Sequence, residues 1–147
     1  MANTIDILGD DAVTDSIIDG SIAELVDDQI TSIGDRAFYN CSALTSIDLP
    51  AVTSISSSAF SGCSALTSID LPAATSIGTN AFQKCTKLTR VILRNTSQVV
   101  SLSNTSAFSN ANSAIIYVPD ALVDNYKAAT NWSTYASRIK GLSEIPA

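Results

Sequence analysis

The sequence contains no histidine, and this absence excludes several kinds of chemistry. Histidine is the usual general base of nucleophilic catalysis and the commonest metal ligand, so no Ser-His-Asp or Cys-His arrangement can form. Glycine is sparse as well, with 6 residues among 147, and no glycine-rich phosphate-binding motif occurs. We therefore expect a protein that is not an enzyme and that holds no cofactor and no metal.

Basic residues are also few. The chain has 8 Lys and Arg against 14 Asp and Glu, which gives a net charge of −6 at pH 7. Proteins that bind nucleic acids or anionic membranes use clusters of basic side chains, and the sequence shows no such cluster. We expect no nucleic-acid partner.

Long hydrophobic runs are absent. The longest run, at residues 114–118, is far too short to span a bilayer, so no membrane insertion is expected. The first residues carry neither the positive segment nor the apolar segment of a signal peptide.

What the sequence does contain is a block of 22 residues that occurs three times. Residues 37–50 recur nearly unchanged as 59–72 and more loosely as 81–94. The same position of each copy is a cysteine, at Cys41, Cys63 and Cys85. A fixed period of this length is typical of a solenoid, in which each coil stacks on the one before.

Each block begins its coil with a short strand. Ile47 and Leu49 alternate around Asp48, which is the pattern of a strand with one buried face. Pro50 ends that strand because it cannot donate to a sheet. A second extended segment is predicted at residues 53–55, with its isoleucine inside.

The rest of the coil is predicted to be a short helical turn. The residues that precede it are good helix N-caps: Asp35, Ser57 and Thr79. The turn carries a phenylalanine, and stacking the coils about 4.8 Å apart predicts one internal column of rings. That column consists of Phe38, Phe60 and Phe82.

The repeat degrades at both ends, where a solenoid needs caps. We predict a single domain over 1–147, with an N-terminal cap containing a degenerate half coil over 1–28, repeats over 29–119 and a helical cap over 120–147. Residues 11–19 are expected to be helical. Asp120 is predicted to cap one C-terminal helix, and Gly141 to follow the end of a second. The apolar stripe of that second helix is Trp132, Tyr135, Ala136 and Ile139.

The repeat resembles the BspA-like, or treponemal-type, leucine-rich repeats. The resemblance rests on the pattern Ala-Phe-x-x-Cys-x-x-Leu-x-x-Ile-x-Leu-Pro followed by Thr-Ser-Ile, and it covers residues 22–119. It implies a short right-handed leucine-rich-repeat solenoid that is mostly β, closed by a helical C-terminal cap. Residues 116–132 also resemble the ending of many such proteins from gut Firmicutes and their prophages.

The better known members of that family are surface or secreted adhesins, so the resemblance implies a binding scaffold. The chain shows neither an export signal nor a wall-anchoring signal. We therefore expect a cytoplasmic or virion-associated protein, unless another route exports it.

The column of cysteines is interpreted as structural. Parallel Cβ vectors on stacked coils hold the Cβ atoms too far apart for a disulfide. Metal sites draw their ligands from converging loops, whereas these positions follow one wall. Buried cysteine packs as a small hydrophobic residue.

Asp48 and Asp70 occupy the outward position of successive strands, so their carboxylates should stack one coil apart. Like charges in that arrangement are unfavourable by up to about 1 kcal/mol, which a divalent cation or a basic ligand would relieve. The alternative, which we favour, is a pair of solvated carboxylates that keeps an exposed sheet soluble. If a ligand surface exists, we expect it on this strand face, at Ser46, Asp48, Ser68, Asp70, Arg90 and Ile92.

The sequence thus favours a non-catalytic recognition or adhesion module that binds a cell-surface protein or glycan. The alternative is a structural or assembly protein. Its repeats and N-terminal segment would then make homo-oligomer or virion contacts, because an incompletely covered end coil invites association.

Overall fold

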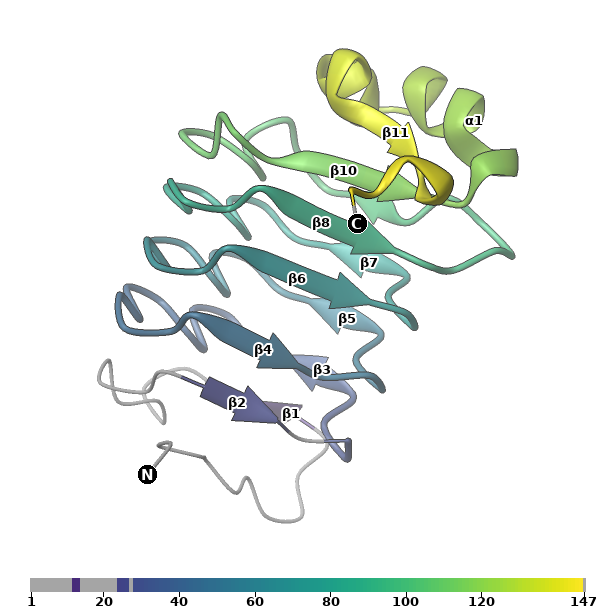
Figure 1. Cartoon of the computed structure of the whole chain (residues 1–147). Coiled ribbons are helices and arrows are strands. Elements are labelled where there is room, and N and C mark those ends of the chain that lie inside the picture. The colour runs from purple at the N-terminus through teal and green to yellow at the C-terminus, as the bar shows by residue number, and fades with distance from the viewer. Residues whose placement is uncertain (1–11, 14–23, 27, 147) are drawn as a thin grey trace.

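In the computed structural model, two parallel β-sheets form two walls of a leucine-rich-repeat solenoid, with a cap of short helices at one end (Figure 1). The structure describes residues 12–13, 24–26 and 28–146, with side chains from residue 28 onward. No helix in this part of the chain is long and apolar enough to cross a membrane.

The first wall, the large sheet, has six strands. They are β2 (Glu24–Val26), β4 (Ser46–Asp48), β6 (Ser68–Leu71), β8 (Arg90–Leu93), β10 (Ile115–Val118) and β11 (Ile139–Gly141). The second wall, the small sheet, has five strands. They are β1 (Ala12–Val13), β3 (Ser32–Ile33), β5 (Ser54–Ile55), β7 (Ser76–Ile77) and β9 (Ser101–Leu102).

The strand register follows the 22-residue period of the sequence. Asp48 pairs with Asp70 in the large sheet, and Ile55 pairs with Ile77 in the small sheet. The coil that contains β9 is longer, because Ser101 pairs with Ser76 across 25 residues. In the sequence, Phe108 follows Phe82 by 26 residues, which predicts an insertion of four residues around 95–106. The offset of 25 between Ser76 and Ser101 places three of these four residues before β9.

The N-terminal strands change one prediction. Residues 12–13 form β1, which pairs with β3, so the predicted helix over 11–19 is wrong there, and its other residues lie outside the described part. β2 pairs with β4 with the 22-residue offset that the aligned sequence predicts. The division of the chain at residues 28 and 119 stays a prediction.

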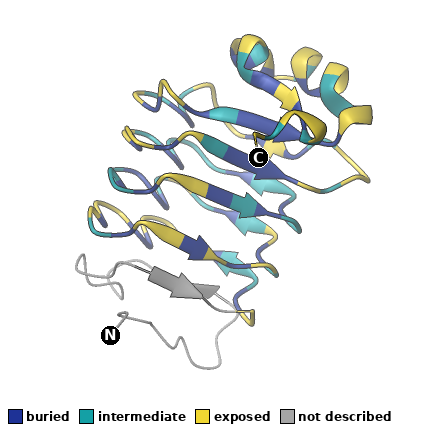
Figure 2. Ribbon diagram, in the orientation of Figure 1, coloured by how far each residue is buried: buried dark blue, intermediate teal, exposed yellow. Residues whose placement is uncertain are grey.

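The interior holds the predicted column of phenylalanine rings, extended by one coil. The rings of Phe38, Phe60, Phe82 and Phe108 are parallel within 3°, with centroids 5.0–5.4 Å apart. All four are buried, and the strands alternate buried and exposed residues as expected of one inward face (Figure 2). Stacking each coil on the next therefore buries one continuous core.

The predicted helical turn before each cysteine is instead a series of tight turns. Arg36 and Asn40 both have a φ of 56°, in the left-handed region that no helix contains. This backbone bonds to the next coil: the Phe38 amide donates to the carbonyl of Ala59 at 2.7 Å. Asp35 does not cap a helix, because its carboxylate accepts a hydrogen bond from the Ser57 amide at 3.2 Å. Amides that bond to the next coil thus alternate with amides that bond within the turn, such as that of Tyr39, which donates to the Arg36 carbonyl at 3.1 Å.

The C-terminal cap differs from the two helices that the sequence predicts. It contains three 3₁₀ helices and one α-helix, namely η1 (Asp120–Leu122), α1 (Val123–Ala128), η2 (Trp132–Arg138) and η3 (Leu142–Glu144). Asp120 is the first residue of η1, and its carboxylate accepts from the Ser143 amide at 3.1 Å. Gly141 ends β11, which pairs with β10 and extends the large sheet. The open edge of β10 needs partners for its backbone groups, and β11 supplies them.

Side chains of the cap make hydrogen bonds to backbone groups at the edge of the small sheet. The Tyr126 hydroxyl accepts from the Val100 amide at 2.8 Å, and the Trp132 indole donates to the Val100 carbonyl at 2.6 Å. The Asn131 amide donates to the Leu102 carbonyl at 2.6 Å. These groups take the places that the backbone of another coil would occupy.

Candidate functional site

The outward face of the large sheet brings the six predicted ligand-binding residues together in two rows. One row contains Asp48, Asp70 and Ile92, which pair across three successive strands. The other contains Ser68 and its partner Arg90. Ser46 precedes Asp48 by two residues on β4 and therefore points to the same face.

The exposure of these residues changes along the solenoid. Ser46, Asp48 and Ser68 are exposed, whereas Asp70 and Arg90 are half-buried. Ile92 points to the same face and yet is only 9% exposed. The face is thus open on its first coils and covered on its later ones.

Asp70 is held by an arginine that the sequence reasoning missed. The Arg94 Nε donates to both carboxylate oxygens of Asp70 at 3.0 Å. This ion pair offsets part of the repulsion expected between Asp48 and Asp70. Arg94 lies one residue beyond β8, and the other copies of the repeat have no basic residue at the equivalent position, Pro50 or Pro72.

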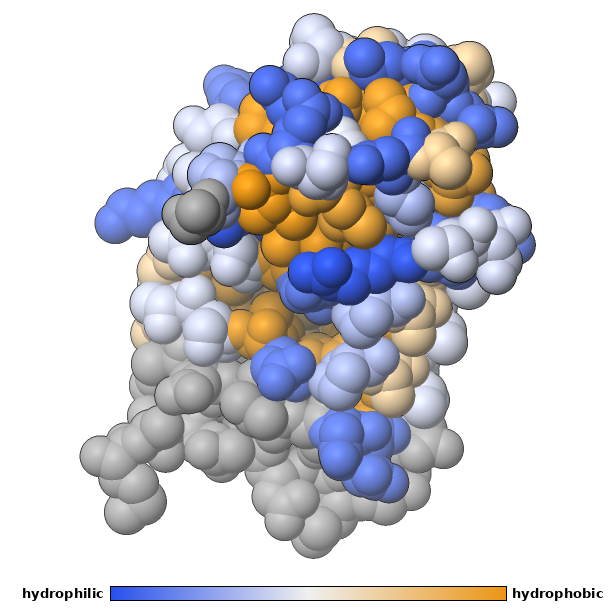
Figure 3. Space-filling view, turned by 45° about the vertical axis from the view of Figure 1, so that its right-hand side comes forward, coloured by the Kyte–Doolittle hydropathy of each residue, from blue (hydrophilic) through white to orange (hydrophobic). Residues whose placement is uncertain are grey.

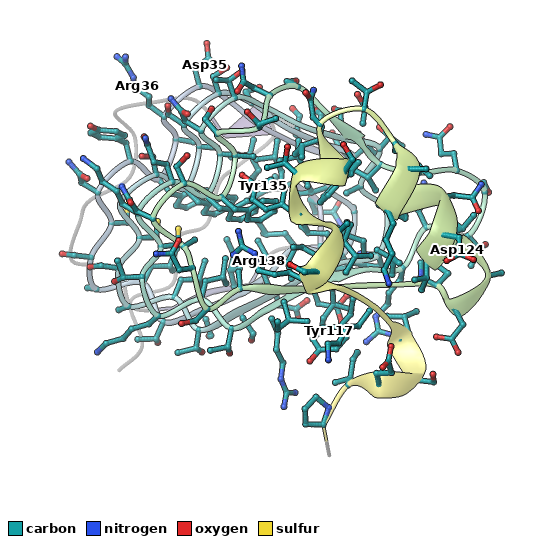
Figure 4. All side chains as sticks on the ribbon, turned by 90° about the horizontal axis from the view of Figure 1, so that it is seen from above. Asp35, Arg36, Tyr117, Asp124, Tyr135 and Arg138 are labelled. Atoms are coloured by element: carbon teal, nitrogen blue, oxygen red, sulfur yellow. The ribbon has the colours of Figure 1, made fainter. Side chains whose placement is uncertain are left out.

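Acidic and thiol side chains do not converge elsewhere in a way that would hold a metal. Among the described residues, no group of three or more His, Cys, Asp and Glu side chains is placed to do so. An open pocket lined by Asp35, Arg36, Ser57 and Ser58 lies among the turns. Figure 4 shows Asp35 and Arg36 on the opposite side of the molecule from Tyr117 and the large-sheet face.

The covered part of the face lies beneath residues 142–146. The Arg90 Nη2 donates to the Pro146 carbonyl at 3.3 Å, and η3 contacts β10. Tyr117 pairs with Ile92 in the outward row and is only 5% exposed. Figure 4 shows Tyr117 directed from β10 toward this segment. Nothing in the sequence indicates this contact, because residues 142–146 occur once and have no copy in the repeat.

A hydrophobic surface continues beside this contact. Figure 3 shows hydrophobic residues gathered where the cap meets the upper coils. The partly buried apolar residues that pack against the core there include Val99, Leu122 and Val123.

The three cysteines are buried thiols in the interior wall. Cys63 donates to the Phe38 carbonyl and Cys85 to the Phe60 carbonyl, each at 3.1 Å. Burial raises the pKa of the Cys63 thiol far above its usual range and raises the pKa of Cys85 to about 12. Reactive cysteines need a lowered pKa and access to solvent, so the column is structural.

Comparisons with known proteins agree with this architecture. The sequence model of the BspA type leucine rich repeat region matches residues 21–134 in six copies. Among solved structures, a leucine-rich repeat protein of T. pallidum is similar, with a TM-score of 0.67 and 26% sequence identity. The match covers 80% of this chain and 56% of that protein, so the chain spans little more than half of that relative. No curated protein matches the sequence.

Proposed function

Because the chain belongs to the BspA-type leucine-rich repeat family, we propose that it is a recognition module that binds a cell-surface protein or glycan through the outward face of its large sheet. Leucine-rich repeat proteins generally mediate protein interactions and are typically non-enzymatic. An adhesin-like or virion-associated role fits the resemblance of residues 116–132 to proteins of gut Firmicutes and their prophages.

The observation that carries the proposal is the open part of the large-sheet face. Ser46, Asp48 and Ser68 are exposed side chains fixed on paired strands. Strands hold such groups at regular spacing, so a partner meets a surface that is already ordered and loses little entropy on binding. The adjacent Asp70–Arg94 ion pair adds both signs of charge.

Binding screens against surface proteins and glycans test the proposal when they include two matched variants. Asp48→Lys changes the charge of the open face, and Asp124→Lys makes the same change on the exposed surface of α1, away from that face (Figure 4). We expect Asp48→Lys to weaken binding by roughly tenfold or more, or ~1.4 kcal/mol. Asp124→Lys should bind as the unmodified chain does. Equal binding by both variants would show that the ligand does not use this face.

The second candidate function is assembly. In the described part of the chain, β1 and β2 are the last strands of their sheets at the N-terminal end, whereas the cap covers the other end (Figure 1). Edge strands offer unpaired backbone groups that a second copy can bind. Contacts between copies through this end would make a closed dimer if the same surface were used on both.

A further inference from the structure

The outward row of the large sheet contains two neighbouring apolar residues, Ile92 and Tyr117, between charged residues, Asp70 on one side and Lys140 on the other. Asp48 and Asp70 pair with each other, and Asp70 then pairs with Ile92, which pairs with Tyr117. The outward isoleucine and tyrosine lie in neighbouring strands, and Ile115, which pairs with Arg90, is half-buried beside them, so these residues form an apolar patch on the face. Residues 142–146 lie over this part of the face, because η3 contacts β10 and Pro146 accepts a hydrogen bond from Arg90, and Ile92 and Tyr117 are only 9% and 5% exposed.

The covering segment presents two apolar side chains on one side. Leu142 and Ile145 are half-buried, whereas Ser143 and Glu144 between them are exposed. Side chains three residues apart on a 3₁₀ turn lie on the same side, so both can face the sheet. Pro146 follows and gives its carbonyl to Arg90.

Only a few polar contacts hold this segment. The Gly141 amide donates to Glu144 Oε2 at 2.9 Å, and the Ser143 amide donates to Asp120. The bond from Arg90 to Pro146 is long, at 3.3 Å, and exposed. Exposed hydrogen bonds of this kind contribute little net stability, so the segment is held mainly by two half-buried apolar side chains.

We propose that the patch of Ile92 and Tyr117, with Arg90 beside it, is a binding surface for a short peptide segment of a protein partner. That segment carries two apolar side chains three residues apart, followed by a proline whose carbonyl bonds to Arg90. Residues 142–146 occupy the surface as an internal ligand until the partner segment displaces them. The inference rests on the proposed use of the large-sheet face for recognition and names the peptide chemistry for its apolar half.

The internal segment has a strong advantage over a partner. A tether this short gives it an effective concentration in the millimolar range, so a separate peptide of the same chemistry competes poorly in the full chain. Removing the segment removes the competition. The surface should then accept the same residues supplied as a separate molecule.

The experiment uses the chain shortened to end at Gly141 and a synthetic peptide of residues 142–147. The readout is the NMR chemical shift of the Ile92 methyl groups and the Tyr117 ring as the peptide is added up to millimolar concentration. We expect saturable shifts in the shortened chain and none in the full chain. A scrambled peptide of the same composition should cause none in either. A shortened chain that melts cooperatively but shows no shift at these two residues would overturn the inference.

A second variant keeps the test informative if the shortened chain does not fold. Ile145→Asp in the full chain should release the segment, move the Ile92 methyl signals and permit peptide binding. Unchanged Ile92 signals in that variant would show that Ile145 does not hold the segment on the surface, which contradicts the inference. The Asp48→Lys comparison tests the open acidic half of the face independently of the peptide experiment. If Asp48→Lys weakens partner binding but the peptide causes no shift, the proposed function stands and only this inference is overturned.

Discussion

At the level of single residues, Gly62 lies in a turn that leaves no room for a side chain. Its φ is 80°, and the equivalent residues Asn40 and Lys84 have φ values of 56° and 62°. A Cβ atom at Gly62 would lie 2.1 Å from Oδ1 of Asn40 on the coil below. The left-handed backbone and the neighbouring amide thus both favour glycine here.

We predict that Gly62→Ala lowers the free energy of unfolding by about 1–3 kcal/mol, because alanine is strained in this conformation and its methyl group contacts Asn40. Adding Asn40→Ala removes the amide, so the double variant should lose less than the sum of the two single variants. Urea unfolding of all four chains measures this coupling. Strict additivity would show that the Asn40 contact does not matter.

The buried thiols predict a dependence of stability on alkaline pH. Burial raises the pKa of Cys85 to about 12 from 9.0, so the folded chain holds this proton more tightly than the unfolded chain. The stabilisation is complete below pH 9 and is lost as the pH rises from 9 toward 12.

We expect the chain to lose on the order of 1 kcal/mol per buried thiol between pH 9 and 10. Burial also raises the pKa of Tyr126, which adds to the loss above pH 10. Urea midpoints at several pH values measure the effect, with Cys85→Ala as the comparison. That variant should be less stable at neutral pH and less sensitive to alkali. An identical pH dependence in both chains would contradict the account.

At the scale of the element, the sequence predicts what repeats and fails where a feature occurs once. The 22-residue period predicted the strands β4 to β8, their register and the phenylalanine column, because three near-identical copies set the same hydrophobic alternation. The apolar stripe through Trp132 and Ile139 suggested one helix, but Ile139 lies in β11. The unpaired edge of β10 outweighed that helical pattern, and no sequence repeat could reveal the edge.

The positions of the candidate site that repeat were predictable from the sequence, and the contacts that occur once were not. Its two rows follow from the strand period, so the six residues could be placed on one face. The partner of Asp70 and the cover over Ile92 come from Arg94 and residues 142–146, which have no counterparts in the other copies. Both required the three-dimensional path of the chain.

The hydrogen bonds between the cap and β9 give a prediction for one element. Tyr126→Phe leaves the buried Val100 amide without its acceptor, which should destabilise the chain by about 1–3 kcal/mol. Tyr39→Phe is the matched control, because Tyr39 is 49% exposed and its change should stay within about 0.5 kcal/mol. Thermal or urea unfolding of the two variants distinguishes them. Equal stability would mean that water replaces the lost hydroxyl group and that the cap does not depend on this bond.

At the scale of the whole molecule, the last repeat strands at the C-terminal end of the solenoid are covered by the cap. β11 pairs with the last repeat strand of the large sheet, and cap side chains bond to the backbone of Val100 and of Leu102 in β9. Another copy therefore cannot add directly to the last repeat strands, β9 and β10, which disfavours head-to-tail stacking of the repeats at this end. The covering of this end is consistent with the proposal that a partner binds the large-sheet face.

Recognition of a partner by the repeats requires that the large-sheet face is not used for assembly with copies of this chain. The solution mass, measured by light scattering over a range of protein concentrations with and without calcium, tests it most directly. We expect a mass of 15.3 kDa under every condition. A discrete larger mass would contradict recognition by a monomer and favour assembly, and a mass that rises only with calcium would make Asp48 and Asp70 the first residues to mutate.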